Sequence, residues 1–395
     1  MQQALEGVRV LDLSQDIAGP YCTRMLAGYG AEVIKIEKPG LGDRSRSISP
    51  FLNDEPGLER SGLFLYLNSN KKGITLDLES KAGVKIFKEL VKDADVVVES
   101  FRPGVMDSLG LGYSALEKIN PGLVMTSITG FGQTGPYRDY NLSHLVAWGM
   151  SGGRYTNGQP GVPPWQGPNW LSDYFTGCYG ATGTLSALYY ANVTGTGQQV
   201  DVSMLEGMLL MVPFPAVIYS FLDKAYTSLT ICFLGVFPCK DGYIGMNFLT
   251  QAQWELICAF FGMPELIEDP RFENMALIIE HLEEARALFA PKIAEWNEMD
   301  LFLAATEWRI PAGLIPTTKE IVESPQHQAR HYFEDVEHPV IGKITMPGAP
   351  FKMMETPWQT RNAAPLLGEH NQEIYCSHLD YTREDLIKLR ERGII

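Results

Sequence analysis

Residues 8–37 read VRVLDLSQDIAGPYCTRMLAGYGAEVIKIE, and this stretch decides the fold class that we predict. The apolar run at 8–13 is typical of a buried strand, and a second strand is expected at 31–37. Between them, a turn at 14–20 leads into a helical segment that extends to Leu26. A strand, a helix and a strand at this spacing form a right-handed crossover between parallel strands. We therefore predict an α/β fold with a large, Rossmann-like domain built on a parallel sheet.

The first turn of this unit argues against a nicotinamide cofactor. It reads DIAGPYCT at 16–23, without the GxGxxG glycines that let a pyrophosphate approach the N-terminus of the helix. Glu37 does end the second strand, where a dinucleotide-binding fold places the acid that binds ribose. Because the glycines are missing, we retain the sheet type and disfavour nicotinamide binding.

Later strands end in loops that contain glycine, proline or basic side chains. ADVVVE at 94–99, for example, runs into SFRPG at 100–104. In a doubly wound sheet such loops meet at the carboxyl edge, where ligands bind. We expect five basic residues on that rim: Lys38, Arg46, Lys71, Lys72 and Arg102. Together they suit a phosphate-bearing ligand, although each one singly also fits a solvated surface charge.

The stretch WLSDYFTGCYGATGTLSALYYANVTGTGQQVD at 170–201 begins a long helix with one face of small residues. These recur at three- and four-residue spacing: Gly177, Gly180, Ala181, Gly183, Thr184 and Ala187. Such a face can approach a neighbouring backbone closely, which would explain the glycines in a helix. Ser172 and Asp173 stand where an N-cap is expected, at the positive end of the helix dipole. From this stretch, a simple cap is the favoured interpretation of Asp173.

Composition narrows the class of protein. The 395 residues are 45% hydrophobic, enough for two domains with sizeable cores. A formal net charge of −15 argues against nucleic-acid and anionic-membrane partners. The six cysteines are scattered, as in a cytosolic protein with reduced thiols, and they form no zinc motif. The cysteine pattern therefore predicts no metal site. MQQALEGVRVLDL at the start lacks the features of an export signal, so we expect a cytoplasmic protein.

Six sequence blocks, in order and with consistent spacing, indicate a family. They are LEGVRVLDLSQDIAGPYCTRMLAGYGAEVIKIEKPGLGDRSR, NKKGITLDL, ADVVVESFRPGVMDSLGLGY, NPGLVMTSITGFGQTGPY, SDYFTGCYGATGTLSALYYANVTGTGQQVDVSM and APLLGEHNQEI. Each block is weak by itself, but together they span nearly the whole chain. The chain resembles the class III CoA-transferases, the group that includes formyl-CoA and carnitine CoA-transferases and the α-methylacyl-CoA racemases.

The resemblance implies a domain arrangement. It places the first part of a large CoA-binding α/β domain at 1–204, a linker at 205–228, a smaller α+β domain at 229–330, and a linker with the return to the large domain at 331–395. It also implies two protomers interlocked like linked rings. The uncharged run MLLMVPFPAVIYSFL at 208–222 is too short and too broken by proline to span a membrane, and a second subunit would cover it. We expect a homodimer, with a heteromer of homologous subunits as the alternative.

The resemblance further implies an activity. In this family the nucleophile is an aspartate at the position of Asp173, whose carboxylate attacks a thioester, forms a mixed anhydride and releases CoA thiolate. An acceptor acid then reacts in a second exchange through an aspartyl-CoA thioester. Small residues after Asp173 would leave room for the acyl group, and backbone N–H groups there would stabilise the developing oxyanion. The substrates implied are an acyl-CoA thioester and a carboxylic acid, with no permanently bound cofactor.

The CoA contacts of the family map onto a defined set of residues: Ile17, Ala18, Lys38, Leu76, Asp77, Ser100, Phe101 and Arg102. Three departures qualify the resemblance. Lys38 replaces a frequent arginine, and Ser108 replaces another that would contact phosphate. The segment 229–238 lacks the glycine-rich loop of the formyl branch, which argues against formyl or oxalate chemistry. Four aromatic residues near the site would allow a bulkier acyl group, although each one singly is more often a core residue: Trp148, Trp165, Trp170 and Tyr174.

Two other functions stay open. The racemases of the family pair the aspartate with a histidine in a GHD-type sequence, and DYNLSHLVAWG at 139–149 offers His144 displaced and without those neighbours. A lone histidine is more often structural, so a 2-methylacyl-CoA racemase is our second hypothesis. The third is a non-catalytic CoA-binding subunit that works with an active homologue; the intact Asp173 argues against it.

Overall fold

A computed structural model describes residues 3–156, 167–211, 213–223 and 235–395. The chain divides into two compact units, of which one comprises Met1–Thr227 with Tyr332–Ile395 and the other Ser228–His331. The candidate functional residues all belong to the first unit. None of the helices that the structure describes has the length and apolar character needed to cross a lipid bilayer.

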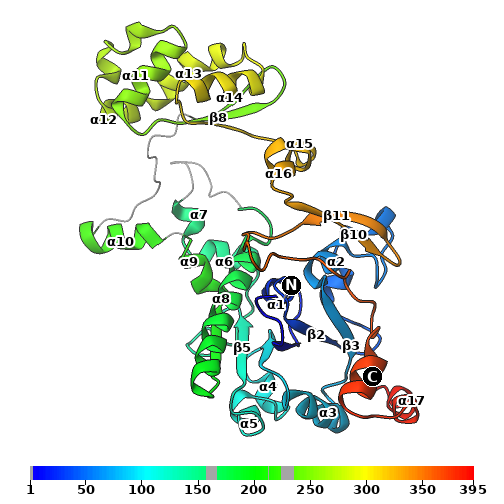
Figure 1. Cartoon of the computed structure of the whole chain (residues 1–395). Helices are drawn as coiled ribbons and strands as arrows, with labels where there is room; N and C mark the ends of the chain where they lie inside the picture. The colour runs from blue at the N-terminus through cyan, green and yellow to red at the C-terminus, as the bar shows by residue number, and fades with distance from the viewer. Residues whose placement is uncertain (1–2, 157–166, 212, 224–234) are drawn as a thin grey trace. The chain divides into compact units, whose positions relative to one another are not determined.

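The first unit is built on a six-stranded parallel sheet with the order β3-β2-β1-β4-β5-β6 (Figure 1). Its strands are β1 Arg9–Asp12, β2 Glu32–Glu37, β3 Lys71–Thr75, β4 Val96–Glu99, β5 Val124–Thr129 and β6 Gln199–Ser203. The strand order reverses between β1 and β4, as in doubly wound folds. The predicted α/β class and parallel sheet are therefore confirmed.

Helices cover both faces of this sheet. The helices of this unit include α1 Ala18–Gly28, α2 Gly62–Asn68, α3 Lys81–Val91, α4 Val105–Ser108, α5 Tyr113–Leu116, α6 His144–Met150, α7 Gly153–Thr156, α8 Leu171–Thr194 and α17 Arg383–Glu391. Successive strand residues point to opposite faces, so Val10 packs with α1 and α8 while Leu11 packs with α3 and α17. Near-continuous apolar strands are needed for a sheet that is buried on both sides.

The small-residue face of α8 packs directly on its neighbours. A Cβ added at Gly177 would lie 2.7 Å from the carbonyl oxygen of Ala18 in α1, and one at Gly180 would lie 2.9 Å from Ile128 in β5. The expected close approach is therefore confirmed. The expectation that these small residues leave room for an acyl group is wrong, because α1 and the sheet occupy that space.

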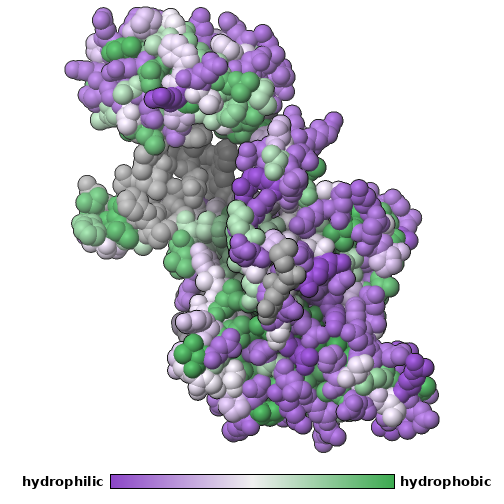
Figure 2. All heavy atoms as spheres, viewed as in Figure 1, coloured by the Kyte–Doolittle hydropathy of each residue, from purple (hydrophilic) through white to green (hydrophobic). Residues whose placement is uncertain are grey.

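After β6 the chain forms two more helices, α9 Met204–Leu209 and α10 Pro213–Leu222. The apolar run at 208–222 is thus largely helical. Met208 is buried, but several other described side chains of the run face solvent, with Phe221 84% exposed and Leu222 59% exposed. Figure 2 shows α10 as an apolar segment of the surface.

The C-terminal part of the first unit returns to the sheet. It begins with the antiparallel hairpin of β10 Phe333–His338 and β11 Gly342–Pro347. Further along, the backbone N–H of Thr75 at the end of β3 donates to Oδ1 of Asn371 over 2.8 Å. Ile394 and Ile395 then join the core that covers one face of the sheet.

The second unit combines a small antiparallel sheet with helices. Its elements are β7 Gly235–Pro238, β8 Tyr243–Met246, α11 Gln251–Phe260, α12 Met275–Glu280, α13 Leu282–Ile293, α14 Glu298–Glu307, β9 Ala312–Leu314, α15 Thr318–Glu323 and α16 Pro325–Ala329. The three strands pair in the order β7-β8-β9. Trp254 is fully buried and packs against Phe248, Phe272 and Phe289, so this unit has its own aromatic core.

Candidate active site

A cleft of about 1070 Å³ opens at the carboxyl edge of the parallel sheet. It lies at the point where the strand order reverses, because Gln15 after β1 and Ser100 after β4 both line it. Ligands of doubly wound proteins bind at such a point. The volume is at the upper end of the roughly 300–1,000 Å³ that is common for ligand pockets.

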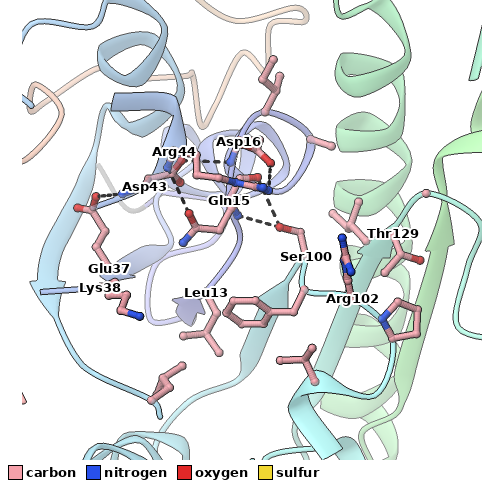
Figure 3. Close-up of a pocket in the computed structure, with 18 of the residues that line it drawn as sticks. Leu13, Gln15, Asp16, Glu37, Lys38, Asp43, Arg44, Ser100, Arg102 and Thr129 are labelled. Carbon is pink, nitrogen blue, oxygen red and sulfur yellow. Dashed lines mark hydrogen bonds and ion pairs between the residues drawn. The ribbon is translucent and has the colours of Figure 1, made fainter. Parts of the chain in front are cut away.

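The nine site residues expected from the sequence all line this cleft: Ile17, Ala18, Lys38, Leu76, Asp77, Ser100, Phe101, Arg102 and Asp173. They follow the carboxyl ends of the first four strands or lie in the first turn of α8. Figure 3 shows Lys38 on one side of the cleft and Arg102 on the other. The structure therefore brings these residues together, while the role of each stays a prediction.

Lys38 and Arg102 lie on the rim as expected. The Nζ of Lys38 is 3.2 Å from a carboxylate oxygen of Glu79, and Nη2 of Arg102 donates to Oδ1 of Asn141 over 2.9 Å. Both cations are substantially exposed, so an incoming anionic ligand can reach them. Their present partners are surface contacts that hold a side chain weakly.

The other three basic residues do not lie on the rim. Lys71 and Lys72 begin β3, at the opposite edge of the sheet. The Nζ of buried Lys71 is 2.9 Å from Oδ2 of Asp12, and burial lowers the pKa of Lys71 to about 8. Buried Arg46 places its Nε 2.7 Å from Oε2 of Glu37. The prediction was wrong because strand direction and a buried carboxylate partner decide where these charges point.

Glu37 is equally unavailable to a dinucleotide. Besides the contact with Arg46, its carboxylate accepts a 2.8 Å hydrogen bond from the backbone N–H of Asp43. Figure 3 shows Glu37 turned toward Asp43, and Glu37 is itself among the residues that line the cleft. A ribose would have to displace a buried ion pair to reach this carboxylate, which agrees with the missing glycine fingerprint.

The loop after β1 contributes a charged pair that the sequence argument did not single out. Asp16 has a φ of +65° and forms an ion pair with Arg44, and both residues line the cleft (Figure 3). Burial raises the pKa of Asp16 although Arg44 acts in the opposite direction. Arg138, in the loop after β5, is a further cation of the lining. The sequence GDRSR at 42–46 was a signal for Arg44.

Asp173 lies in the first turn of α8 and is not its cap. The N-cap is Trp170, with a φ of +61° and no side-chain hydrogen bond to the helix. The backbone N–H groups of Asp173 and Tyr174 both donate to the carbonyl of Trp170, so these two amides are engaged within the first turn of the helix. Burial raises the pKa of the Asp173 carboxyl above the usual range, while Ser172 and His144 act to lower it.

A hydrogen-bonded chain reaches the carboxylate of Asp173 from α6. The Nδ1 of His144 is 2.8 Å from Oγ of Ser172, and Oγ donates to Oδ2 of Asp173 over 3.0 Å. Sequence reasoning favoured a structural role for His144 and kept it as the candidate histidine of the racemase hypothesis. The contact could not be seen from the sequence because 28 residues separate His144 from Ser172.

Of the aromatic residues expected to enlarge the acyl site, Trp148, Trp170 and Tyr174 are described, and these three do not line the cleft. Trp170 and Tyr174 pack with Ile17 in a small apolar cluster, and the ring of Tyr174 lies edge-on to Tyr21 with centroids 4.9 Å apart. Trp165 lies outside the described residues. In the described chain these rings support the wall behind Ile17, so they give no evidence of a bulkier acyl group.

The structure also shows where two departures from the family pattern lie. Ser108 ends α4 and donates through Oγ to the carbonyl of Val105 over 2.7 Å, and it is not part of the cleft lining. Of the segment 229–238, residues 229–234 lie outside the described residues and the rest is β7. Across the described ranges, no three His, Cys, Asp or Glu side chains form a group that could hold a metal ion.

Comparisons with known proteins agree with this geometry. The sequence model of CoA-transferase family III matches residues 5–371. Succinyl-CoA–D-citramalate CoA-transferase of Chloroflexus aurantiacus is 35% identical over 403 residues, covering 99% of this chain and 98% of that protein. Formyl-CoA:oxalate CoA-transferase of Rhodopseudomonas palustris is 33% identical over 430 residues, covering 100% and 98%. A solved CAIB/BAIF family protein from Brucella suis matches with a TM-score of 0.85 at 28% identity, covering 95% and 100%.

These matches extend over the site as well as the sheet. The family match begins before β1 and ends beyond β11, so it includes every loop that lines the cleft. The relatives keep more than 30% identity over almost their whole length. The chain therefore belongs to CoA-transferase family III and is an enzyme that transfers CoA between carboxylic acids.

Proposed function

We propose that the enzyme transfers CoA from an acyl-CoA thioester to an acceptor acid through a covalent intermediate on Asp173. The observation that supports this most is the position of Asp173, whose carboxylate lines the same cleft as the loops after β1, β2, β3 and β4. A ligand bound along those loops would have one end close to the carboxylate of Asp173, which is partly buried. A poorly solvated carboxylate is a stronger nucleophile than a hydrated one.

The reaction proceeds in two exchanges. One carboxylate oxygen of Asp173 attacks the thioester carbon, the new C–O bond forms, the C–S bond breaks, and CoA leaves as thiolate. The thiolate then attacks Cγ of Asp173, which releases the donor acid with the attacking oxygen and leaves an aspartyl-CoA thioester. The acceptor carboxylate then attacks Cγ of the aspartyl-CoA thioester and releases CoA thiolate, which leaves a mixed anhydride between Asp173 and the acceptor. The thiolate attacks the acceptor carbonyl carbon of this anhydride, which forms the product thioester and regenerates the carboxylate of Asp173.

The rim cations are proposed to hold the phosphates of CoA. Lys38 and Arg102 stand on opposite walls of the cleft, and Arg102 presents a planar guanidinium that suits a phosphate. Lys38 supplies charge without that fork, so we assign the larger share of phosphate recognition to Arg102. Ile17 and Ala18, which also line the cleft, are proposed to contact the CoA chain.

Mass spectrometry of the intact protein tests the covalent intermediate. The purified chain is mixed with a donor, succinyl-CoA or formyl-CoA, and with an acceptor, D-citramalate or oxalate, the acids in the names of the two relatives. We expect a CoA adduct that hydroxylamine releases and that peptide mapping places on Asp173. Because of the altered 229–238 segment, we expect the formyl-CoA and oxalate pair to react least. Transfer without any adduct on Asp173 would contradict the mechanism.

A racemase remains the second candidate because one observation favours it. His144 reaches Asp173 through the hydroxyl group of Ser172, so an acid and a base are linked beside the cleft that Asp173 lines. Racemisation needs two such groups on opposite faces of an α-carbon. In the structure Nδ1 of His144 contacts Ser172 and not open space, which favours transfer over racemisation.

We also propose an interlocked homodimer. The exposed apolar residues of α9, α10 and the residues between them include Leu209, Leu210, Val217, Phe221 and Leu222. An apolar surface of this kind marks a contact with another protein. A second copy of the chain is the partner that the family resemblance implies, and an interlocked arrangement would cover this segment in both copies. A heteromer with a homologous subunit is the alternative.

The remaining expectations concern cellular context. We propose that the enzyme works in the cytoplasm, supported by the absence of disulfides among the five described cysteines. We also propose that CoA thioesters serve as substrates and that no cofactor stays bound. Cell fractionation tests the first proposal. Metal analysis and an absorbance spectrum of the purified protein test the second, since a bound metal or chromophore would contradict it.

A further inference from the structure

Ser172 connects the proposed nucleophile to a second helix. Its hydroxyl group contacts Oδ2 of Asp173 at 3.0 Å and Nδ1 of His144 at 2.8 Å. Ser172 has no exposed surface, so solvent does not compete for the hydroxyl. His144 is the first residue of α6, and Ser172 is the second residue of α8. The contact therefore fixes the start of one helix to the start of the other, directly beside the carboxylate.

The direction of these hydrogen bonds follows from the groups involved. An ionised carboxylate accepts and cannot donate, so the hydrogen in the contact with Asp173 comes from Ser172. A hydroxyl has one hydrogen, so Ser172 must accept in its contact with His144, whose Nδ1 then carries the proton. The backbone nitrogen of Ser172 is also 3.4 Å from Nδ1, but this longer contact competes poorly with the one at 2.8 Å.

We propose that Ser172 stabilises the negative charge that forms on Oδ2 of Asp173 when the acylated aspartate is attacked, and that His144 is the positioning residue for the Ser172 hydroxyl. This inference rests on the proposed function, because it concerns the covalent intermediate on Asp173. It gives the two residues separate tasks. Ser172 contacts a reacting atom, whereas His144 acts through Ser172.

The charge on Oδ2 changes during the reaction in a way that suits this donor. When thiolate or the acceptor carboxylate adds to Cγ, the electron pair of the Cγ–Oδ2 double bond moves onto Oδ2. It returns when the acid or the thiolate leaves, so no proton is transferred and the atoms balance. The resting carboxylate shares its charge over two oxygens, whereas the tetrahedral species concentrates a charge on Oδ2. A fixed donor therefore stabilises the transition state more than the ground state.

Two of the four chemical steps occur at Cγ of Asp173, and the other two occur at the carbonyl carbon of a substrate. Ser172 therefore serves the formation and the breakdown of the aspartyl-CoA thioester. The backbone N–H groups of Asp173 and Tyr174 are bonded to the carbonyl of Trp170, so they are less available as this donor. The side chain of Ser172 thus replaces the backbone donors that we had expected at this position.

Single-turnover kinetics of the full-length enzyme test the inference. Succinyl-CoA loads wild type, Ser172→Ala and Ser172→Thr, and the decay of the aspartyl-CoA adduct is followed by intact-protein mass spectrometry after succinate is added. We expect decay to slow about 10²-fold in Ser172→Ala, the usual effect of removing an oxyanion donor. The Kd for CoA should stay within about twofold, because the rim contacts are intact, and Ser172→Thr should restore much of the rate because it keeps the hydroxyl.

His144 variants test the positioning role. His144→Ala should slow decay about 2- to 10-fold, the effect of losing one ordinary hydrogen bond. His144→Asn should recover part of that loss, since its amide nitrogen can replace Nδ1 as donor. Thr176→Val is the matched control, because it removes a buried hydroxyl of α8 that bonds to the backbone carbonyl of Ser172 and not to Asp173. Its decay should match wild type.

The outcomes separate this inference from the proposed function. If wild type forms no adduct on Asp173 with any donor, the proposed function fails and the inference fails with it. If wild type forms the adduct and Ser172→Ala decays at the wild-type rate, the inference alone is overturned. It is overturned as well if Ser172→Ala and Thr176→Val slow decay equally, because a general packing defect would then explain both.

Discussion

The backbone N–H of Gln15 donates a 2.8 Å hydrogen bond to Oγ of Ser100. Gln15 follows β1 and Ser100 follows β4, and these two strands are neighbours where the strand order of the sheet reverses. Both residues line the cleft, so the hydrogen bond joins its two halves and is visible in Figure 3. Because Arg102 is two residues beyond Ser100, the same hydrogen bond also restricts the position of the Arg102 backbone at the rim.

Removal of the proposed nucleophile gives the first prediction. Asp173→Ala should lower CoA transfer by at least about 10³-fold, because the loss of a covalent nucleophile removes the reaction path and not one contact. Binding of CoA should change little, since Lys38 and Arg102 are untouched. Transfer is measured by separating acyl-CoA products, and binding by calorimetry. Retention of most of the activity in a folded variant would exclude Asp173 as the nucleophile.

The rim cations give a second prediction with a built-in control. Arg102→Ala should raise KM for the acyl-CoA donor about 10- to 100-fold, because a hydrogen bond to a charged group contributes roughly 1.5–3 kcal/mol. Lys72→Ala should leave KM within about twofold, because Lys72 pairs with Glu32 and Glu373 at the opposite edge of the sheet. Equal effects of the two substitutions would show that overall charge, and not the rim, sets the affinity.

A third prediction concerns pH. Asp173 attacks as a carboxylate, and burial raises its pKa, so activity should fall as the pH drops through a value above that of an ordinary aspartate. The hydrogen bond from Ser172 lowers this pKa, so the acidic limb should move to higher pH in Ser172→Ala. The profile of kcat/KM against pH measures both. A limb at the ordinary aspartate value, unmoved in Ser172→Ala, would contradict the assignment.

Much of the fold follows from local sequence patterns. The apolar strands at the start of the chain predict the parallel sheet because alternate residues must be buried on both of its faces, as Val10 and Leu11 are. The small residues of α8 predict close packing because Gly177 has no space for a Cβ beside Ala18. In contrast, a helical α10 was not foreseen, since prolines and an uncharged run fit a linker equally well.

The sequence predicted the site residues that follow the ends of strands. It did not predict contacts between side chains that are far apart in the sequence. Lys38 and Ser100 follow strands, so the parallel sheet itself brings them to one edge. The prediction that Lys71 lies on the rim was wrong because its charge is neutralised by Asp12, a residue 59 positions away. The contact between His144 and Ser172 was missed for the same reason: it depends on how α6 meets α8.

Assembly gives a fourth prediction. The exposed apolar residues of α10 would be unfavourable in water on a lone protomer, so the 44.0 kDa chain should sediment as a dimer at micromolar concentration. Phe221→Asp together with Leu222→Lys should weaken the dimer, because burial of a charge at an apolar contact is unfavourable. Analytical ultracentrifugation checks both. A stable wild-type monomer would contradict the interlocked arrangement, and a shift only after adding a homologous subunit would favour the heteromer.

The choice between transferase and racemase gives the last prediction. A transferase needs an acceptor acid, whereas a racemase exchanges the α-proton of its substrate with solvent. Because Nδ1 of His144 contacts Ser172, we expect no catalytic incorporation of solvent deuterium at the α-position of a 2-methylacyl-CoA. His144→Gln should lower transfer only about 2- to 10-fold, the effect of one hydrogen bond. Mass spectrometry of the recovered acyl-CoA measures the exchange. Rapid exchange in wild type that His144→Gln abolishes would make His144 a catalytic base and the enzyme an epimerase.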